Sequence, residues 1–168
     1  MDTQKDKNWR VKKADKDIWS VDTELYLQEI MSMLDTGRKA VIPVSGSSMT
    51  PFLCGGRDFV LLESTKYHAV KKGDIVLFLR PTGQFILHRV YSVTKDKYKI
   101  IGDAQHIIEG PIWEEQLKAV AVRVKRKGKW LKKWSFWNWF FRWIWIRVVP
   151  FRMKIIQVYR YLKIIIKK

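Results

Sequence analysis

Ser48, His88 and Asp103 are the three side chains whose types and order in this sequence could perform nucleophilic catalysis. A serine hydroxyl is a weak nucleophile, so it needs a base that takes its proton and N–H groups that face the developing oxyanion. Histidine is a base suited to neutral pH, and an aspartate can hold its ring in the right tautomer. No glycine-rich phosphate loop and no metal-spaced Cys/His cluster offers a competing chemistry, and the series implies neither a metal nor a cofactor.

Ser48 belongs to a turn that the sequence predicts to be rigid and exposed. Gly46 permits a tight backbone before it, and Pro51 fixes the path of the chain after it. We expect the backbone amides of Gly46, Ser47 and Ser48 to be the oxyanion donors. The local sequence is equally compatible with a serine-rich turn that only caps a strand.

His88 lies in the alternating run Phe85–Tyr91, where it shares one face with Ile86 and Val90. A histidine on an apolar face is more often a satisfied core residue than a catalyst. However, an imidazole that is held on a rigid strand and partly desolvated is also what a general base requires. Asp103 is in turn either the residue that orients His88 or a plain turn residue, and the local sequence does not separate these roles.

The elements that must position these residues are short runs of β-branched and aromatic residues between Lys39 and about Arg126. Strands at such spacing indicate a mainly β fold, a small antiparallel domain with a rolled or barrel-like core. An amphipathic helix is expected before it, from Ser20 or Asp22 to Gly37. The predicted strands are Asp58–Glu63, Asp74–Arg80, Gln84–Val93, Lys97–Ile101 and Gln116–Lys125.

Positive charge is concentrated at the C-terminal end of the 168 residues. Residues 1–117 hold 17 Lys/Arg and 16 Asp/Glu, whereas residues 118–168 hold 16 Lys/Arg and no acid. The same segment carries six of the nine tryptophans, at positions 130, 134, 137, 139, 143 and 145. Cations and aromatic rings together indicate a surface that binds anionic lipid or nucleic acid. The single cysteine, Cys54, excludes an internal disulfide framework and is expected to be an inert apolar residue.

The segment Trp134–Phe151 is strongly apolar, but its longest uncharged run is 8 residues, against the roughly 20 that span a bilayer. An interfacial helix fits better, because tryptophan rings settle at headgroup depth while cations meet anionic lipid. Pro150 is expected to end this helix, and Arg152–Ile166 to form a second surface-lying helix. The residues assigned to the membrane are Trp134, Trp137, Trp139, Arg142, Trp143, Trp145 and Arg147, with Lys132, Lys133, Arg152 and Lys154 as further cations.

Two other interpretations of the tail remain. The helix pair could dock onto a partner protein, or it could bind nucleic acid. Nucleic acid is the weaker of the two, because so many Ile, Val and Trp residues would leave an unexplained apolar patch on a soluble protein. The first twenty or so residues are polar and charged, so we expect no signal-peptide core and no N-terminal anchor.

Four ordered motifs resemble the sequence boxes of type I signal peptidases and their relatives, the clan that includes LexA-type self-cleaving proteases. The motifs are Val44-x-Gly46-x-Ser48-Met49-x-Pro51-x-Leu53, Lys72-Gly73-Asp74-Ile75-Val76, His88-Arg89-Val90 and Gly102-Asp103. The resemblance covers approximately residues 40–125 and implies a serine endopeptidase with Ser48 as nucleophile. Most bacterial members place a lysine before the Arg-Val pair, so His88 is similar to the endoplasmic-reticulum and archaeal type.

In that branch an acidic residue at or after the Gly-Asp motif supports the histidine. The resemblance implies Asp103 for this role, with Glu109 as the alternative. Many members carry a serine oxyanion donor two places before the nucleophile, and Gly46 stands there in this chain, so backbone donors remain. Typical members also begin with a transmembrane helix that places the site outside the cytoplasm. The family thus favours the outer face of a membrane, whereas the basic tail favours the cytoplasmic face.

We therefore expect a charged leader and amphipathic helix over residues 1–39, a catalytic β domain over 40–128 and a basic, Trp-rich membrane-associating tail over 129–168. The expected function is a membrane-associated serine endopeptidase that cleaves signal or leader peptides from precursor proteins. Its partners would be a precursor peptide and an anionic membrane surface. The alternative is a non-catalytic peptide- or partner-binding module of the same fold. A LexA-like regulator fits less well, because its base would be lysine and a DNA-binding head is missing.

Overall fold

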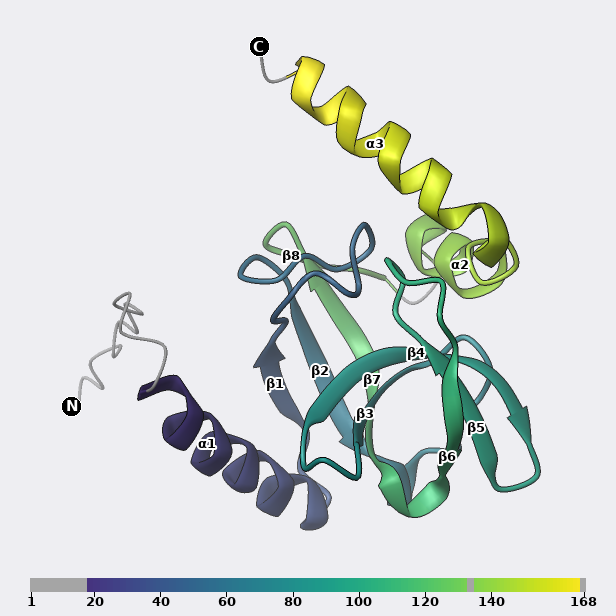
Figure 1. The fold of residues 1–168 in the computed structure, drawn as a ribbon. Coiled ribbons are helices and arrows are strands. Elements are labelled where there is room, and N and C mark those ends of the chain that lie inside the picture. The colour runs from purple at the N-terminus through teal and green to yellow at the C-terminus, as the bar shows by residue number, and fades with distance from the viewer. Residues whose placement is uncertain (1–17, 133–134, 167–168) are drawn as a thin grey trace, which may run out of the picture.

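The computed structural model describes residues 18–132 and 135–166, in which an antiparallel sheet is flanked by helices (Figure 1). The strand order is β1-β2-β7-β3-β4-β5-β6, and β8 pairs with β7. Every pairing is antiparallel, and Figure 1 shows the long strand β4 curving strongly. The strands are β1 (Ala40–Pro43), β2 (Phe59–Ser64), β3 (Ile75–Leu79), β4 (Phe85–Thr94), β5 (Lys97–Ile101), β6 (Glu109–Trp113), β7 (Leu117–Arg126) and β8 (Lys129–Trp130).

The expectation of a mainly β, antiparallel fold is confirmed, and each of the predicted strands is present to within one residue at either end. Three strands were not predicted. β1 has four residues and ends at Pro43, β8 has two residues, and β6 contains Gly110 and Pro111, which are poor strand formers.

The core lies on both faces of the sheet. Successive side chains of a strand point to opposite faces, so β3 contributes Ile75 and Leu77 to one apolar cluster and Val76 and Phe78 to the other. The continuous apolar sequence of β3 follows from this burial on both sides.

Helix α1 (Ile18–Asp35) begins a little before the predicted start and ends where the sequence indicated. Ile30 and Leu34, one helical turn apart, are its buried contacts with the sheet domain. Gly37 has a φ of 76° and its N–H donates to the Leu34 carbonyl, which is the usual way a glycine ends a helix.

The C-terminal segment forms α2 (Phe136–Trp143), a 3-10 turn (Val149–Phe151) and α3 (Arg152–Ile166), so the predicted break near Pro150 and the second helix are both present. This segment is not a separate appendage. Phe141 packs on Phe52 with ring centroids 4.8 Å apart, and Trp145, Ile146 and Ile156 are buried. α3 then projects away from the sheet (Figure 1). Within the described ranges, none of the helices combines the length and apolar character needed to cross a membrane.

Candidate active site

The loop that carries Ser48 connects β1 to β2 and is closed at its base by Asp58. The Val44 N–H donates to the Asp58 carbonyl across 2.9 Å. The buried Asp58 carboxylate accepts hydrogen bonds from the backbone N–H groups of Cys54 and Lys127 and from the Arg57 guanidinium. Burial opposes the charge on Asp58, but these hydrogen bonds prevail and lower the pKa of its carboxyl. The loop is therefore held in place by the buried, charged carboxylate of Asp58.

Ser48 is half-buried on the tight turn that the sequence predicted. Gly46 has a φ of 70°, which favours glycine. A Cβ on Gly55 would lie 2.3 Å from the Gly46 carbonyl oxygen, so glycine at position 55 allows the two sides of the loop to approach closely. Among the described residues, the N–H groups of Gly46, Ser47 and Ser48 donate no backbone hydrogen bond. They remain available as oxyanion donors.

The Ser48 turn is in direct contact with the Gly102–Asp103 turn. The Ala104 N–H donates to the Ser48 carbonyl across 2.7 Å. A Cβ on Gly102 would lie 2.7 Å from the same oxygen, which real side chains do not tolerate. The structure therefore brings together two motifs that are more than fifty residues apart in the sequence.

His88 lies in β4 opposite Val76 of β3, is 2% exposed and stands beside the ring of Phe78. Its Nδ1 lies 3.3 Å from Oε1 of Glu109. The two atoms are close but do not form a well-aligned hydrogen bond, because Nδ1 is enclosed and has no hydrogen-bond partner among the described residues. The small exposed surface of His88 therefore belongs to atoms other than Nδ1.

Burial is the main cause that lowers the pKa of His88 below its ordinary value. The charge of Arg80 acts in the same direction, while the carboxylates of Glu109 and Asp103 oppose it. Arg80 also holds Glu109 through two hydrogen bonds of 2.8 and 2.6 Å. At neutral pH the imidazole is therefore uncharged, which is the form that a general base requires.

Asp103, the first choice for orienting His88, is engaged with another residue. Its carboxylate is fully buried and accepts from Arg89 Nε and Nη2 across 2.8 and 2.7 Å. Arg89 and His88 are neighbours on β4, where successive side chains point to opposite faces, and the hydrogen bonds of the Asp103 carboxylate go to Arg89. Glu109, the alternative acid, is the one whose carboxylate lies beside His88.

The structure does not join Ser48 to His88 by a hydrogen bond. Within the described residues the Ser48 hydroxyl has no hydrogen-bond partner, and neither residue lines the surface pockets of about 780 and 1220 Å³. Catalytic hydrogen bonds are often long in the absence of substrate. The structure thus shows two separate contacts, one between the Ser48 turn and the Gly102 turn and one between His88 and Glu109.

Two residues that support the site were assigned by the sequence to the membrane surface. Trp145 is 4% exposed, and its indole N–H donates to the Asp103 carbonyl across 2.9 Å. Arg152 is fully buried, and its Nη1 donates to the carbonyls of Gly102 and Gln105 across 2.9 and 3.1 Å. Both side chains therefore hold the turn that contacts Ser48, and neither is available to lipid.

The other residues assigned to the membrane have different positions. Trp137, Trp139 and Trp143 are exposed on α2, and Arg147 is exposed after it. Arg142 is partly exposed and forms an ion pair with Asp74 across 2.7 Å. Lys133 and Trp134 lie outside the described residues. Of the tryptophans assigned to the membrane, the exposed ones in the described residues are thus on α2, whereas Trp145 belongs to the core.

No group of three or more His, Cys, Asp or Glu side chains in residues 18–132 and 135–166 is arranged to hold a metal ion. No protein-family model matches the chain, and no curated protein or solved structure matches it either.

Proposed function

We propose that this chain is a serine endopeptidase in which Ser48 is the nucleophile, His88 the general base and Glu109 the carboxylate that orients His88. The observation that carries the proposal is the position of the His88 imidazole, which is buried and has Nδ1 3.3 Å from Oε1 of Glu109. Glu109 is itself held by Arg80 through two hydrogen bonds, so the carboxylate beside the imidazole has a fixed position. The order of the four sequence motifs supports the same chemistry and the signal peptidase-like variant of a mainly β fold.

In this mechanism Ser48 Oγ attacks the carbonyl carbon of the scissile peptide bond while His88 takes the hydroxyl proton. The N–H groups of Gly46, Ser47 and Ser48 bind the oxyanion of the tetrahedral intermediate. His88 then gives its proton to the leaving amine, and the peptide bond breaks to leave an acyl ester on Ser48. Water hydrolyses the ester, with His88 again acting as base. Ser48 Oγ and the imidazole must approach each other when substrate binds, because no hydrogen bond joins them in its absence.

The substrate class that we propose is a signal or leader peptide presented at a membrane. Four aromatic side chains of α2, namely Phe136, Trp137, Trp139 and Trp143, are between 42 and 63% exposed, and the segment around them is rich in cations. Exposed tryptophans and cations are typical of interfacial helices. The protein would then lie on an anionic membrane surface and cleave precursor peptides there.

The test is digestion of a complex peptide mixture that contains membrane-bound precursors, with cleavage products identified by mass spectrometry. Wild-type protein should produce new peptide ends, and Ser48→Ala and His88→Ala should not. Ser47→Ala is the matched control, because Ser47 is exposed on the same turn and contributes only its backbone. A serine-directed phosphonate probe should label the wild type and the control but not Ser48→Ala. If wild type neither cleaves nor reacts with the probe, the chain is a non-catalytic peptide-binding module.

A further inference from the structure

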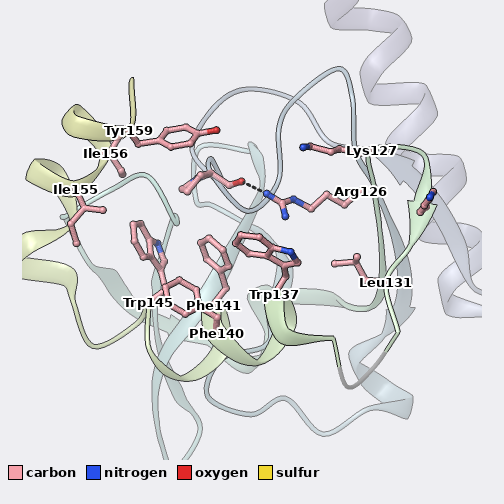
Figure 2. Close-up of a pocket in the computed structure, with 12 residues that line it drawn as sticks. Arg126, Lys127, Leu131, Trp137, Phe140, Phe141, Trp145, Ile155, Ile156 and Tyr159 are labelled. Carbon is pink, nitrogen blue, oxygen red and sulfur yellow. Dashed lines mark hydrogen bonds between the residues drawn. The ribbon is translucent and has the colours of Figure 1, made fainter. Parts of the chain in front are cut away.

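A pocket of about 780 Å³ lies between α2, α3, the turn that joins β7 to β8, and the Ser48 loop at Pro51. Figure 2 shows α3 side chains on one side of this pocket and Arg126 and Lys127 on the opposite side. The catalytic residues proposed above do not line it. Its volume is in the range of pockets that bind small organic molecules.

One wall of the pocket is cationic. Arg126, Lys127 and Lys129 line it from the β7–β8 turn, and none of them forms an ion pair with a residue that the structure describes. The Arg126 guanidinium is held in place, since its Nη2 donates to the Pro51 carbonyl across 3.1 Å and its Cζ lies 4.8 Å from the centroid of the Trp137 ring. Its Nε is enclosed and has no hydrogen-bond partner among the described residues. The Asp58 carboxylate near this turn is paired with Arg57, so the side chains of Arg126, Lys127 and Lys129 line the pocket without an ion pair to a described residue.

The remaining walls are apolar. The aromatic rings of Trp137, Phe140 and Phe141 form one side, and Ile155 and Tyr159 of α3 form another (Figure 2). Ile155 and Tyr159 are 42 and 46% exposed, so this surface faces solvent in the absence of a ligand. Covering such a surface with hydrocarbon is favourable, because it removes apolar area from water.

We propose that this pocket binds one molecule of an anionic phospholipid taken from a membrane. Its phosphate would contact Arg126, Lys127 and Lys129, and one acyl chain would lie between α2 and α3. A free phosphate would leave the apolar walls uncovered, and an uncharged lipid would leave the three cations without a counter-charge. The division of the pocket into a cationic edge and an apolar interior therefore matches an amphiphile with a negative headgroup.

This inference rests on the membrane-association part of the proposed function and not on its catalytic residues. The test uses full-length protein and a short-chain phosphatidylglycerol below its micelle concentration, with binding measured by isothermal titration calorimetry. We expect saturable binding of one molecule per chain. Short-chain phosphatidylcholine should bind more weakly, and glycerol phosphate should show no saturable binding.

Arg126→Gln should weaken binding of the short-chain phosphatidylglycerol about tenfold, because it removes charge-assisted hydrogen bonds to the phosphate. Ile155→Asp places a negative charge in the apolar wall, which repels the phosphate, and should also weaken binding of this lipid. Ile155 is exposed, so the variant should stay folded, and circular dichroism checks this. Arg123→Gln is the matched control, because Arg123 is an exposed arginine of the same strand that does not line this pocket.

Any one of four outcomes would overturn the proposal. If phosphatidylcholine binds as tightly as phosphatidylglycerol, the cations do not contribute to recognition. If glycerol phosphate binds as tightly, the apolar walls do not contribute. Saturation by an acidic amphipathic peptide but not by the lipid would identify a protein partner. Sedimentation with vesicles that contain phosphatidylglycerol, together with peptide cleavage, is measured in parallel. If both persist while the short-chain lipid fails to bind, the pocket proposal falls and the proposed function stands.

Discussion

His88 Nδ1 and Glu109 Oε1 lie 3.3 Å apart although their strands, β4 and β6, are separated by β5. The contact depends on strand register, because Val90 pairs with Ile100 and Ile100 pairs with Glu109. His88 and Val90 are on one face of β4, so the Glu109 side chain reaches across β5 toward that face. The pairing of three strands thus decides which carboxylate stands beside the imidazole.

Replacement of this carboxylate tests its role directly. If His88 is the base, Glu109→Gln should lower kcat/KM by about 10²-fold or more, because the imidazole loses the group that orients it. The Glu109 charge raises the pKa of His88, so its removal should also move the acid limb of the pH–rate profile to lower pH. The measurement is the pH dependence of kcat/KM on a cleaved peptide. Glu114→Gln, at an exposed position, is the control, and an unchanged acid limb would exclude Glu109 from the site.

Stability should depend on pH through His88. Burial lowers its pKa in the folded state, so below about pH 6.5 the unfolded chain binds more protons than the folded one. The free energy of unfolding should therefore fall as the pH drops from about 6.5 through the folded pKa, and this contribution is fully present above about pH 6.5. Urea unfolding of the wild type and of His88→Gln across this range measures it. If the difference between the two is independent of pH, His88 does not titrate in this way.

Asp103 is expected to act on stability rather than on catalysis. Asp103→Asn leaves the buried Arg89 without its counter-charge, and breaking a buried pair in this way costs about 3–5 kcal/mol. Urea unfolding should show this loss, whereas Asp96→Asn in an exposed turn should show almost none. The pH–rate profile of the folded fraction should keep its acid limb. If the acid limb shifts as much as expected for Glu109→Gln, Asp103 and not only Glu109 orients His88.

Trp145→Phe separates the indole hydrogen bond from the burial of the ring. The Asp103 carbonyl would lose its donor, which costs about 1–3 kcal/mol for a buried group. Because Asp103 lies in the turn that contacts Ser48, kcat should fall more than KM rises. Trp143→Phe is the control, since Trp143 is exposed. Equal effects of the two substitutions on unfolding and on kcat would show that Trp145 does not position the turn.

The strands were predictable because their β-branched runs are separated by clear turn residues. β6 was missed for a physical reason, since Gly110 and Pro111 occupy its centre and pairing with β5 overrides their preference. The glycine-dependent turn at Ser48 was also predictable from Gly46, whose φ is positive. These features depend on local backbone preferences, which can be inferred from the residue types.

The partner of His88 was not predictable, because it depends on how distant strands align. Register shifts interrupt the pairing between Val90 and Ser92 and between Tyr98 and Ile100, and each shift changes which side chains share a face. Composition was also insufficient for Trp145 and Arg152. Both lie in a cationic, aromatic segment without acids, and only their tertiary contacts distinguish them from the exposed residues around them.

The burial of Trp145, Arg152 and Ile156 also bears on when this protein can become folded during its synthesis. The ribosome makes the β strands first, but the turn at Gly102 stays without its two side-chain donors until residue 152 has left the exit tunnel. A nascent chain that ends at residue 128 would expose Phe52 and the neighbouring core. Completion of the site therefore has to wait for a segment that follows every described strand of the sheet.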